Sequence, residues 1–345
     1  MTVQQLLQYT IENKASDLHL VVGSPPMIRL DGNLVSVVGC EILTPLACEQ
    51  LIAGVMNTEL RQIFGVNKET DFSFTLEDGG RFRVNAYCQK NTQAASFRLI
   101  PSTIPTIDAL GLPAVCHQIV NAKQGFVLVT GPTGHGKSTS LAAIIEEINQ
   151  TRPVHIITIE DPVEYIYSSA RAIVSQREMR SDTHSWDIAL RSILREDPDV
   201  VLIGEMRDFE TISLALTIAE TGHLVFATLH TNSASQTMDR IIDVFPENQQ
   251  AQARIQLSSC LEVVLSQRLV PKIGGGRVAA FEIMKATSAV KTAIRESRTH
   301  MLDNIIMTSG EYGMSTLESS LAGLIKQGLI SREAAEGYAL RAIKI

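Results

Sequence analysis

The chain has 345 residues, of which 45% are hydrophobic and 19% are charged. This composition excludes an intrinsically disordered chain, and the length predicts about two domains. The formal net charge is −7 at pH 7, from 30 basic and 37 acidic residues. A protein that coats nucleic acid or anionic lipid through bulk positive charge is therefore disfavoured.

The cysteines are widely spaced along the chain and form no CxxC pair. An odd number of such cysteines is typical of buried free thiols in a reducing compartment. The N-terminal residues show no signal-peptide pattern, and no apolar run reaches the ~20 residues that span a bilayer. We therefore expect a cytoplasmic protein without a transmembrane segment. The cysteines are Cys40, Cys48, Cys88, Cys116 and Cys260.

The first hundred residues are predicted to form a small mixed domain. Alternating apolar segments are separated by Gly, Pro and Asp, which is typical of antiparallel strands with one buried face. We therefore expect an α+β domain over residues 1–100. Prolines and glycines then interrupt the pattern and predict an interdomain linker over residues 101–116. The alternating segments are residues 18–22, 27–30, 72–76 and 81–87.

A different pattern extends over residues 117–345, where short apolar runs alternate with helical patterns. This is typical of a mostly parallel sheet covered by helices, so we expect an α/β fold. From about residue 287 the pattern is helical, and Leu317 and Leu321 lie on one helix face that we expect to pack in a core. The apolar runs are residues 126–130, 154–159, 200–203, 224–228 and 278–283.

Residues 131–138, with the sequence GPTGHGKS, match the phosphate-binding pattern GxxxxGK[ST] in full. A predicted strand precedes this P-loop and a predicted helix follows it. The glycines let the loop turn its N–H groups inward, Lys137 reaches the β- and γ-phosphates, and Ser138 ligates Mg²⁺. The pattern predicts a bound nucleoside triphosphate. The predicted nucleotide-binding residues are Gly131, Pro132, Thr133, Gly134, His135, Gly136, Lys137, Ser138 and Thr139.

Carboxylates follow two of the predicted strands. Glu205 comes after the strand 200–203, and Gly204 stands where such a strand usually ends in Asp; Glu160 ends another strand. Because the carboxyl ends of parallel strands meet at one edge of a sheet, we expect both carboxylates at the ligand site. We predict that Glu205 is the general base and that Glu160 organises Mg²⁺ and water. For Glu160, helix capping or pairing with an arginine is the alternative.

Histidines and arginines supply further candidates. His223 and His230 bracket a predicted strand, and both a γ-phosphate sensor and a structural role stay open for them. Arg83 and Arg98 lie in a segment without acidic residues and are predicted to act as arginine fingers, in cis or in trans. A solvated basic face and a nucleic-acid strip are the alternatives, and sparse aromatic residues disfavour the second. We expect His135 to be a solvated loop residue.

Several segments together resemble one family. Residues 15–20 (ASDLHL), 23–26 (GSPP) and 29–32 (RLDG) closely resemble the N-terminal domain of type IV pilus retraction ATPases. The resemblance extends over nearly the whole chain. It includes the P-loop and residues 160–164, 189–199, 204–208, 221–231 and 293–296.

The resemblance implies a fold, an activity and partners. The implied fold is a PAS-like N-terminal domain followed by a RecA-like P-loop ATPase domain, in a homohexamer that binds ATP and Mg²⁺ between the domains. It implies that Arg83 and Arg98 reach the phosphates and that His223 and His230 both act there. It also implies a motor for pilus retraction and twitching motility, peripheral at the inner membrane, which contacts a pilus platform protein and a paralogous retraction ATPase without binding nucleic acid directly.

Three alternatives remain open on the sequence. A pilus-extension or type II secretion ATPase usually carries an additional N-terminal domain and a tetracysteine zinc site, which the length and the absence of CxxC disfavour. A RecA-like DNA motor is disfavoured by the negative net charge, because DNA binding needs many cationic contacts. A ring that binds ATP without hydrolysing it is disfavoured by the presence of Lys137 and Glu205.

Overall fold

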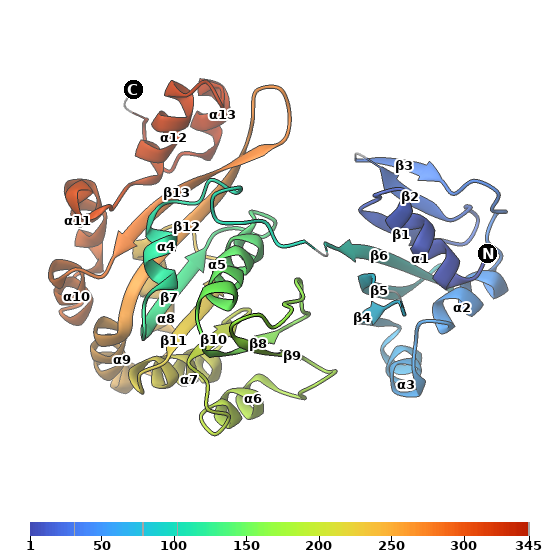
Figure 1. Ribbon diagram of the computed structural model, residues 1–345, viewed down its shortest axis with the longest axis horizontal. Helices are drawn as coiled ribbons and strands as arrows, with labels where there is room; N and C mark the ends of the chain where they lie inside the picture. The colour runs from blue at the N-terminus through green and yellow to red at the C-terminus, as the bar shows by residue number, and fades with distance from the viewer. Residues whose placement is uncertain (31, 78, 102, 344–345) are drawn as a thin grey trace. The chain divides into compact units, whose positions relative to one another are not determined.

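The computed structural model describes residues 1–345 apart from 31, 78, 102, 344 and 345. The chain divides into two compact units, Met1–Thr103 with Pro162–Ile166, and Ile104–Asp161 with Tyr167–Ile345. Figure 1 shows their helices and strands, which confirm the mixed α/β class. In the described part of the chain, no helix has the length and apolar character needed to cross a membrane.

The N-terminal unit contains an antiparallel sheet in the order β3-β2-β1-β6-β5-β4. Along β5, Phe82, Val84 and Ala86 are buried in the core, while Arg83 lies on the opposite face, as the two-residue period of a strand requires. The predicted alternation is therefore confirmed. The elements are α1 (Val3–Glu12), β1 (Asp17–Leu20), β2 (Met27–Leu30), β3 (Asn33–Ser36), α2 (Pro45–Ala53), α3 (Thr58–Asn67), β4 (Glu69–Thr75), β5 (Arg81–Gln89) and β6 (Thr92–Ile100).

The C-terminal unit contains a second sheet in the order β13-β12-β7-β11-β10-β8-β9, parallel except for the pairing of β12 with β13. Its elements are α4 (Val115–Val120), β7 (Gly125–Thr130), α5 (Lys137–Thr151), β8 (His155–Glu160), β9 (Ile173–Glu178), α6 (Trp186–Ile193), β10 (Val200–Ile203), α7 (Phe209–Glu220), β11 (Leu224–Leu229), α8 (Ala234–Asp243), α9 (Glu247–Cys260), β12 (Leu261–Pro271), β13 (Arg277–Lys285), α10 (Ser288–Arg295), η1 (Thr299–Met301), α11 (Leu302–Thr308), η2 (Gly310–Tyr312), α12 (Leu317–Lys326) and α13 (Arg332–Tyr338).

The central strands of this second sheet consist wholly of buried residues. Every residue of β7, β10 and β11 is buried, which explains why their sequences are almost entirely apolar. Neighbouring parallel strands place their carboxyl ends side by side, with Ile203 opposite both Ala227 and Ile159, and Leu229 opposite Thr130. The segments that follow β7, β8, β10 and β11 therefore meet at one edge of the sheet.

Short polar side chains begin many of the helices, because they accept hydrogen bonds from backbone N–H groups that lack a helical partner. Thr2 caps α1 and Asn57 caps α3 in the N-terminal unit. Ser185, Asp208 and Ser233 cap α6, α7 and α8 in the same way.

The C-terminal helices pack against the end of the β12–β13 pair. Leu317 and Leu321 of α12 share a buried cluster with Val270 of β12 and Ala280 of β13. The expectation that this helix face packs in a core is therefore confirmed.

The cysteines are all free thiols. Cys48, Cys116 and Cys260 are buried as expected, and burial raises the pKa of the Cys116 thiol to about 12. Cys40 is half-buried and Cys88 is exposed, so the expectation of burial is wrong for these two.

Candidate functional site

The P-loop connects β7 to α5 and depends on its glycines. The backbone φ angles are +142° at Gly131, +78° at Gly134 and +79° at Gly136, in the region that glycine adopts without strain. A Cβ atom at Gly131 would lie 2.4 Å from the carbonyl oxygen of Gln267, so the loop lies directly against β12. Gly136 is the N-cap of α5 and offers no side-chain cap, so backbone N–H groups at this helix start can meet an anion.

Lys137 is buried and lies within the P-loop. Its ammonium donates hydrogen bonds to the carbonyl oxygens of Gly131, at 2.8 Å, and Pro132, at 3.0 Å. The same nitrogen lies 3.3 Å from Nδ1 of His230, which also lies 3.3 Å from the hydroxyl of Thr133. His230, which follows β11, therefore contacts the P-loop directly.

Glu205 follows β10 and is joined to His230. Its Oε1 lies 3.0 Å from Nε2 of His230, and its Oε2 accepts a hydrogen bond from Arg207 at 2.7 Å. Burial raises the pKa of Glu205, but the hydrogen bond from Arg207, the Nε2 proton of His230 that faces the carboxylate, and the charges of Arg207 and Lys137 outweigh burial and hold it below its usual value. Glu205 is therefore ionised at neutral pH, as a general base must be.

The neighbours of His230 fix its tautomer. An ammonium group only donates hydrogen bonds, so Nδ1 accepts from Lys137 and the Nε2 proton faces the carboxylate of Glu205. Burial and the charge of Lys137 lower the pKa of His230, although Glu205 opposes them. The result is a neutral imidazole that links the P-loop lysine to the carboxylate.

Glu160 ends β8 at the same edge of the sheet. Its side chain is buried, and Oε1 accepts hydrogen bonds from Thr158 at 2.7 Å and Gln176 at 3.2 Å. A Cβ atom at Gly204 would lie 3.2 Å from the Cα of Glu160 and from the carbonyl oxygen of Ile159. A side chain at position 204 would require a small shift of β8, which favours glycine where a Walker B strand usually carries Asp.

The residues present fit a magnesium ion that is held mainly by phosphate and water. Ser138 and Thr139 lie in the first turn of α5, directly beyond the loop. Within the described residues, no group of three or more His, Cys, Asp and Glu side chains forms a metal site. Mg²⁺ at nucleotide sites usually keeps several waters and takes few protein ligands, so its binding does not require such a group.

His223 lies at the opposite end of β11 from His230. Its Nδ1 lies 3.0 Å from the carbonyl oxygen of Ile218 and 3.1 Å from the hydroxyl of Thr221 at the end of α7. His223 and His230 flank the six residues of β11 and are seven residues apart, which corresponds to about 23 Å at roughly 3.3 Å per residue. Within one protomer, the structure therefore brings His230 but not His223 to the P-loop, and a role of His223 at the phosphates stays a prediction.

Arg83 and Arg98 are direct neighbours on β5 and β6, which confirms that they share a face of the N-terminal sheet. Arg98 donates to Asp17 of β1 at 3.0 Å, and Arg29 of β2 lies 3.9 Å from the same carboxylate. Burial raises the pKa of Asp17, but hydrogen bonds from Ser16 and Arg98 hold it below its usual value. Sequence reasoning missed Asp17 and Arg29, which distant strands contribute.

Sequence reasoning also missed the part of β12 that supports the P-loop. The amide of Gln267 accepts from the hydroxyl of Ser140 at 2.7 Å and donates to the carbonyl oxygen of His135 at 2.8 Å. Arg268 donates to the carbonyl oxygen and the side chain of Asn232, close after His230. One strand thus holds both the P-loop and the loop that carries His230.

The structure also corrects the expectation for His135. Its side chain is half-buried, and Nδ1 accepts a hydrogen bond from the backbone N–H of Leu269 at 2.9 Å. The prediction of a solvated loop residue is wrong, because β12 continues beside the loop and buries the ring.

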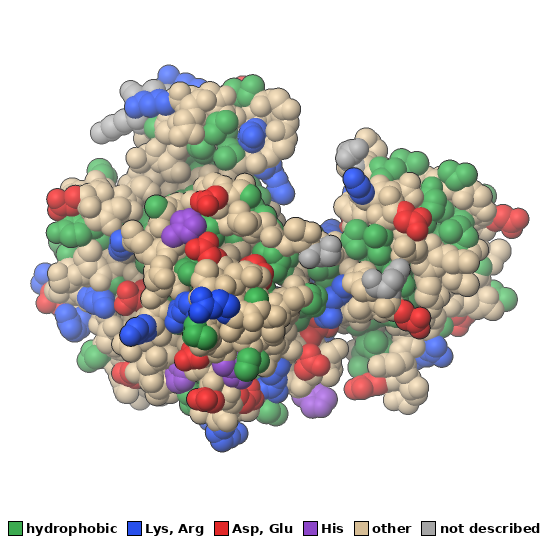
Figure 2. Space-filling model, viewed as in Figure 1, with side chains coloured by type: hydrophobic (Ala, Val, Ile, Leu, Met, Phe, Trp, Pro, Cys, Tyr) green, Lys and Arg blue, Asp and Glu red, His purple; other side chains and the backbone are tan. Residues whose placement is uncertain are grey.

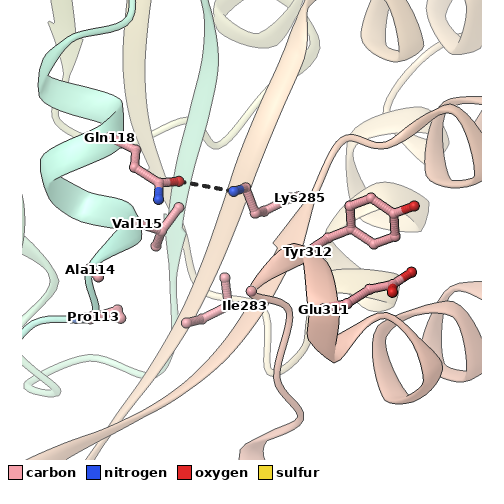
Figure 3. Close-up of a pocket in the computed structure, with 9 residues that line it drawn as sticks. Pro113, Ala114, Val115, Gln118, Ile283, Lys285, Glu311 and Tyr312 are labelled. Atoms are coloured by element: carbon pink, nitrogen blue, oxygen red, sulfur yellow. Dashed lines mark hydrogen bonds between the residues drawn. The ribbon is translucent and has the colours of Figure 1, made fainter.

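A pocket of about 450 Å³ lies away from these residues, between α4, β13 and the segment around η2. Figure 3 shows Gln118 and Lys285 facing each other across it, joined by a hydrogen bond of 2.9 Å. Glu311 and Tyr312 line the opposite part of its wall. None of the predicted site residues lines this pocket.

Comparison with known proteins gives consistent results. The profile of the family described as "Type II/IV secretion system protein" matches residues 1–299. The type IV pilus retraction ATPase PilT of Pseudomonas aeruginosa is 50% identical over 336 residues, which cover 96% of each chain. A twitching motility protein of Neisseria gonorrhoeae is 48% identical over 90% of this chain and 83% of its own. A crystal structure of the pilus retraction motor PilT with bound ADP superposes with a TM-score of 0.93 at 44% identity, covering 99% of this chain and 98% of that one.

The contact between Gly131 and β12 predicts a stability effect. In Gly131→Ala, the Cβ atom meets a backbone carbonyl oxygen at 2.4 Å, so we expect a loss of about 3 kcal/mol or more in the free energy of unfolding. In the matched control Gly134→Ala, nothing lies within 4 Å of the Cβ atom, and only the backbone strain of about 1–2 kcal/mol remains. Urea denaturation measures both, and equal losses would contradict the close approach.

Proposed function

Because the chain belongs to the family of type II/IV secretion system proteins, we propose that it is an ATPase that powers type IV pilus retraction. The observation that carries this proposal is the continuous contact from the P-loop lysine, Lys137, through His230 to the carboxylate of Glu205. The sequence identity of 50% to a pilus retraction ATPase and of 48% to a twitching motility protein, over 96% and 90% of this chain, supports pilus retraction as the process that the ATPase powers.

The proposed reaction is hydrolysis of ATP to ADP and phosphate. The P-loop N–H groups and Lys137 bind the phosphates, and the ionised Glu205 orients water and accepts its proton as the water attacks the γ-phosphate. His230 donates a hydrogen bond through its Nε2–H to Glu205 and so fixes the direction of the carboxylate. A γ-phosphate would draw the ammonium of Lys137 toward itself and weaken its hydrogen bond to Nδ1 of His230. The imidazole would then shift, and its hydrogen bond through Nε2 would reorient the carboxylate of Glu205.

Two further groups complete the proposed site. The hydroxyl of Ser138 would hold a Mg²⁺ ion, which would supply positive charge at the phosphates. Glu160, which accepts hydrogen bonds from Thr158 and Gln176, would organise Mg²⁺ and water. Arg83 and Arg98 are proposed to neutralise the charge that develops during phosphoryl transfer, from the same protomer or from a neighbour.

We further propose that the protein works as a homohexamer at the cytoplasmic face of the inner membrane. In this arrangement it moves a pilus platform protein and can act beside a paralogous retraction ATPase. A nucleic-acid track is disfavoured by the net charge of −7 and by acidic and basic side chains that are interspersed over the face of the C-terminal unit drawn in Figure 2.

Glu205→Gln tests the proposed base. The amide cannot accept the proton of water, so we expect kcat to fall about 100-fold or more while the Kd for ATP stays within about twofold. Steady-state phosphate release and equilibrium binding of a fluorescent ATP analogue measure the two quantities. Glu210→Gln, at an exposed position of α7, is the control. Near-normal hydrolysis by Glu205→Gln would exclude this role.

Arg98→Ala tests the proposed arginine finger. The side chain of Arg98 is 72% exposed, and Asp17 keeps the hydrogen bond from Ser16 and the neighbouring charge of Arg29, so we expect the loss of this ion pair to cost only about 1 kcal/mol of folding free energy. We expect normal unfolding behaviour and a kcat reduced by about 100-fold or more. Lys90→Gln, at the exposed turn between β5 and β6, is the control. An unchanged kcat would contradict this role and support the alternative that Arg98 belongs to a solvated basic face.

Gene deletion tests the direction of the motor. If the protein retracts pili, cells without it should carry surplus surface pili and lose twitching motility. Loss of surface pili would instead indicate an extension or secretion ATPase. Complementation with the Glu205→Gln variant should fail to restore twitching if hydrolysis powers the process.

A further inference from the structure

His135 lies in the middle of the P-loop with both its side chain and its backbone bonded to β12. Nδ1 accepts from the N–H of Leu269 at 2.9 Å, and the carbonyl oxygen accepts from the amide of Gln267 at 2.8 Å. Because a backbone N–H only donates, Nδ1 carries no proton, and the ring is neutral with its proton on Nε2.

The position of Leu269 explains why this acceptor matters. β7 pairs with β12 only as far as Thr130 opposite Ser266, whereas β12 continues to Pro271. On its other edge, β12 pairs with β13, with Leu269 opposite Ala279. Past the end of β7, His135 takes the place of a strand neighbour and satisfies an N–H group that is costly to leave unpaired.

The ring of His135 also reaches the C-terminal helices. Its centroid lies 6.1 Å from that of Tyr338 at the end of α13, with the rings tilted by 57°. Tyr338 packs against the cluster that joins α12 and α13 to β12 and β13. One side chain thus connects the P-loop, a sheet edge and the C-terminal helices.

We propose that the side chain of His135 is a positioning residue of the P-loop, which holds the loop against β12 and thereby sets the affinity for nucleotide phosphates. The part of this proposal that concerns affinity rests on the proposed binding of ATP. The bond to Leu269 can be tested without nucleotide.

The surroundings of His135 keep its acceptor available. It faces Lys137 of α5, Arg268 of β12, Arg277 of β13 and Tyr338 of α13. Burial, followed by the charges of Arg268, Arg277 and Lys137, lowers the pKa of His135. The neutral form is therefore favoured in the folded protein. The stabilising bond is present above the unfolded pKa of about 6.5 and is lost as the pH falls through the lower folded value.

Two variants separate the acceptor from the bulk of the ring. His135→Ala removes the acceptor, whereas His135→Asn places an amide oxygen near the position of Nδ1. Without nucleotide, we expect faster hydrogen exchange at the amide of Leu269 in His135→Ala and near-normal protection in His135→Asn. We also expect an about fivefold to tenfold higher Kd for a fluorescent ADP analogue in His135→Ala only, with kcat at saturating ATP changed less than the KM. The control is His300→Ala, at an exposed position of η1.

Several results would overturn the proposal. Unchanged exchange at Leu269 in His135→Ala would exclude the bond, and an unchanged Kd with faster exchange would exclude its role in phosphate binding. Equal defects in His135→Asn and His135→Ala would assign the effect to the ring instead of the acceptor.

The pH dependence provides a further test. As the pH falls below about 6.5 and through the lower folded pKa of His135, the ADP affinity of the wild type should fall more than that of His135→Asn, which does not titrate. His230 is present in both proteins and contributes equally to their pH dependence, so any difference between them comes from position 135. If the ADP affinities of the wild type and His135→Asn changed in parallel with pH, the proposal would be contradicted.

Discussion

The hydrogen bond between Nε2 of His230 and the carboxylate of Glu205 is the interaction on which the rest of the candidate site depends. On its other side, the same imidazole meets the ammonium of Lys137 at 3.3 Å. The bond to Glu205 orients the carboxylate, and the contact with Lys137 links that orientation to the phosphate-binding loop. Without the imidazole of His230, the contact that joins Glu205 to Lys137 of the P-loop would be lost.

The topology of the sheet makes this contact possible. β7, β11 and β10 are adjacent parallel strands, so the segments that follow them meet at one edge, where the P-loop, His230 and Glu205 lie. β12 then extends beyond β7 and holds the P-loop through Gln267, while Arg268 holds the segment after His230. Glycine is required at position 131 because the loop approaches this strand so closely.

Local sequence signals predicted the P-loop, the carboxylates at the strand ends and the shared face of Arg83 and Arg98. These features follow from short-range patterns, namely glycine spacing, apolar runs and two-residue alternation. Contacts between distant segments could not be predicted in this way. Asp17 and Gln267 reach their partners only through strand pairing, and no local pattern encodes that pairing.

The histidines show the same limit. His223 and His230 look equivalent in the sequence because they bracket one strand, but a strand has two ends and only one of them faces the P-loop. His135 looked solvated because loop residues usually are, and the extension of β12 beyond β7 buries it instead. Three-dimensional placement, and not residue type, separates these roles.

The most direct test of the account is a double-mutant cycle on kcat with Glu205→Gln and His230→Ala. If His230 acts through Glu205, the double variant should lose little more activity than Glu205→Gln alone, because the imidazole has no base left to orient. If the two losses multiply, His230 acts independently of Glu205, and the central claim is contradicted.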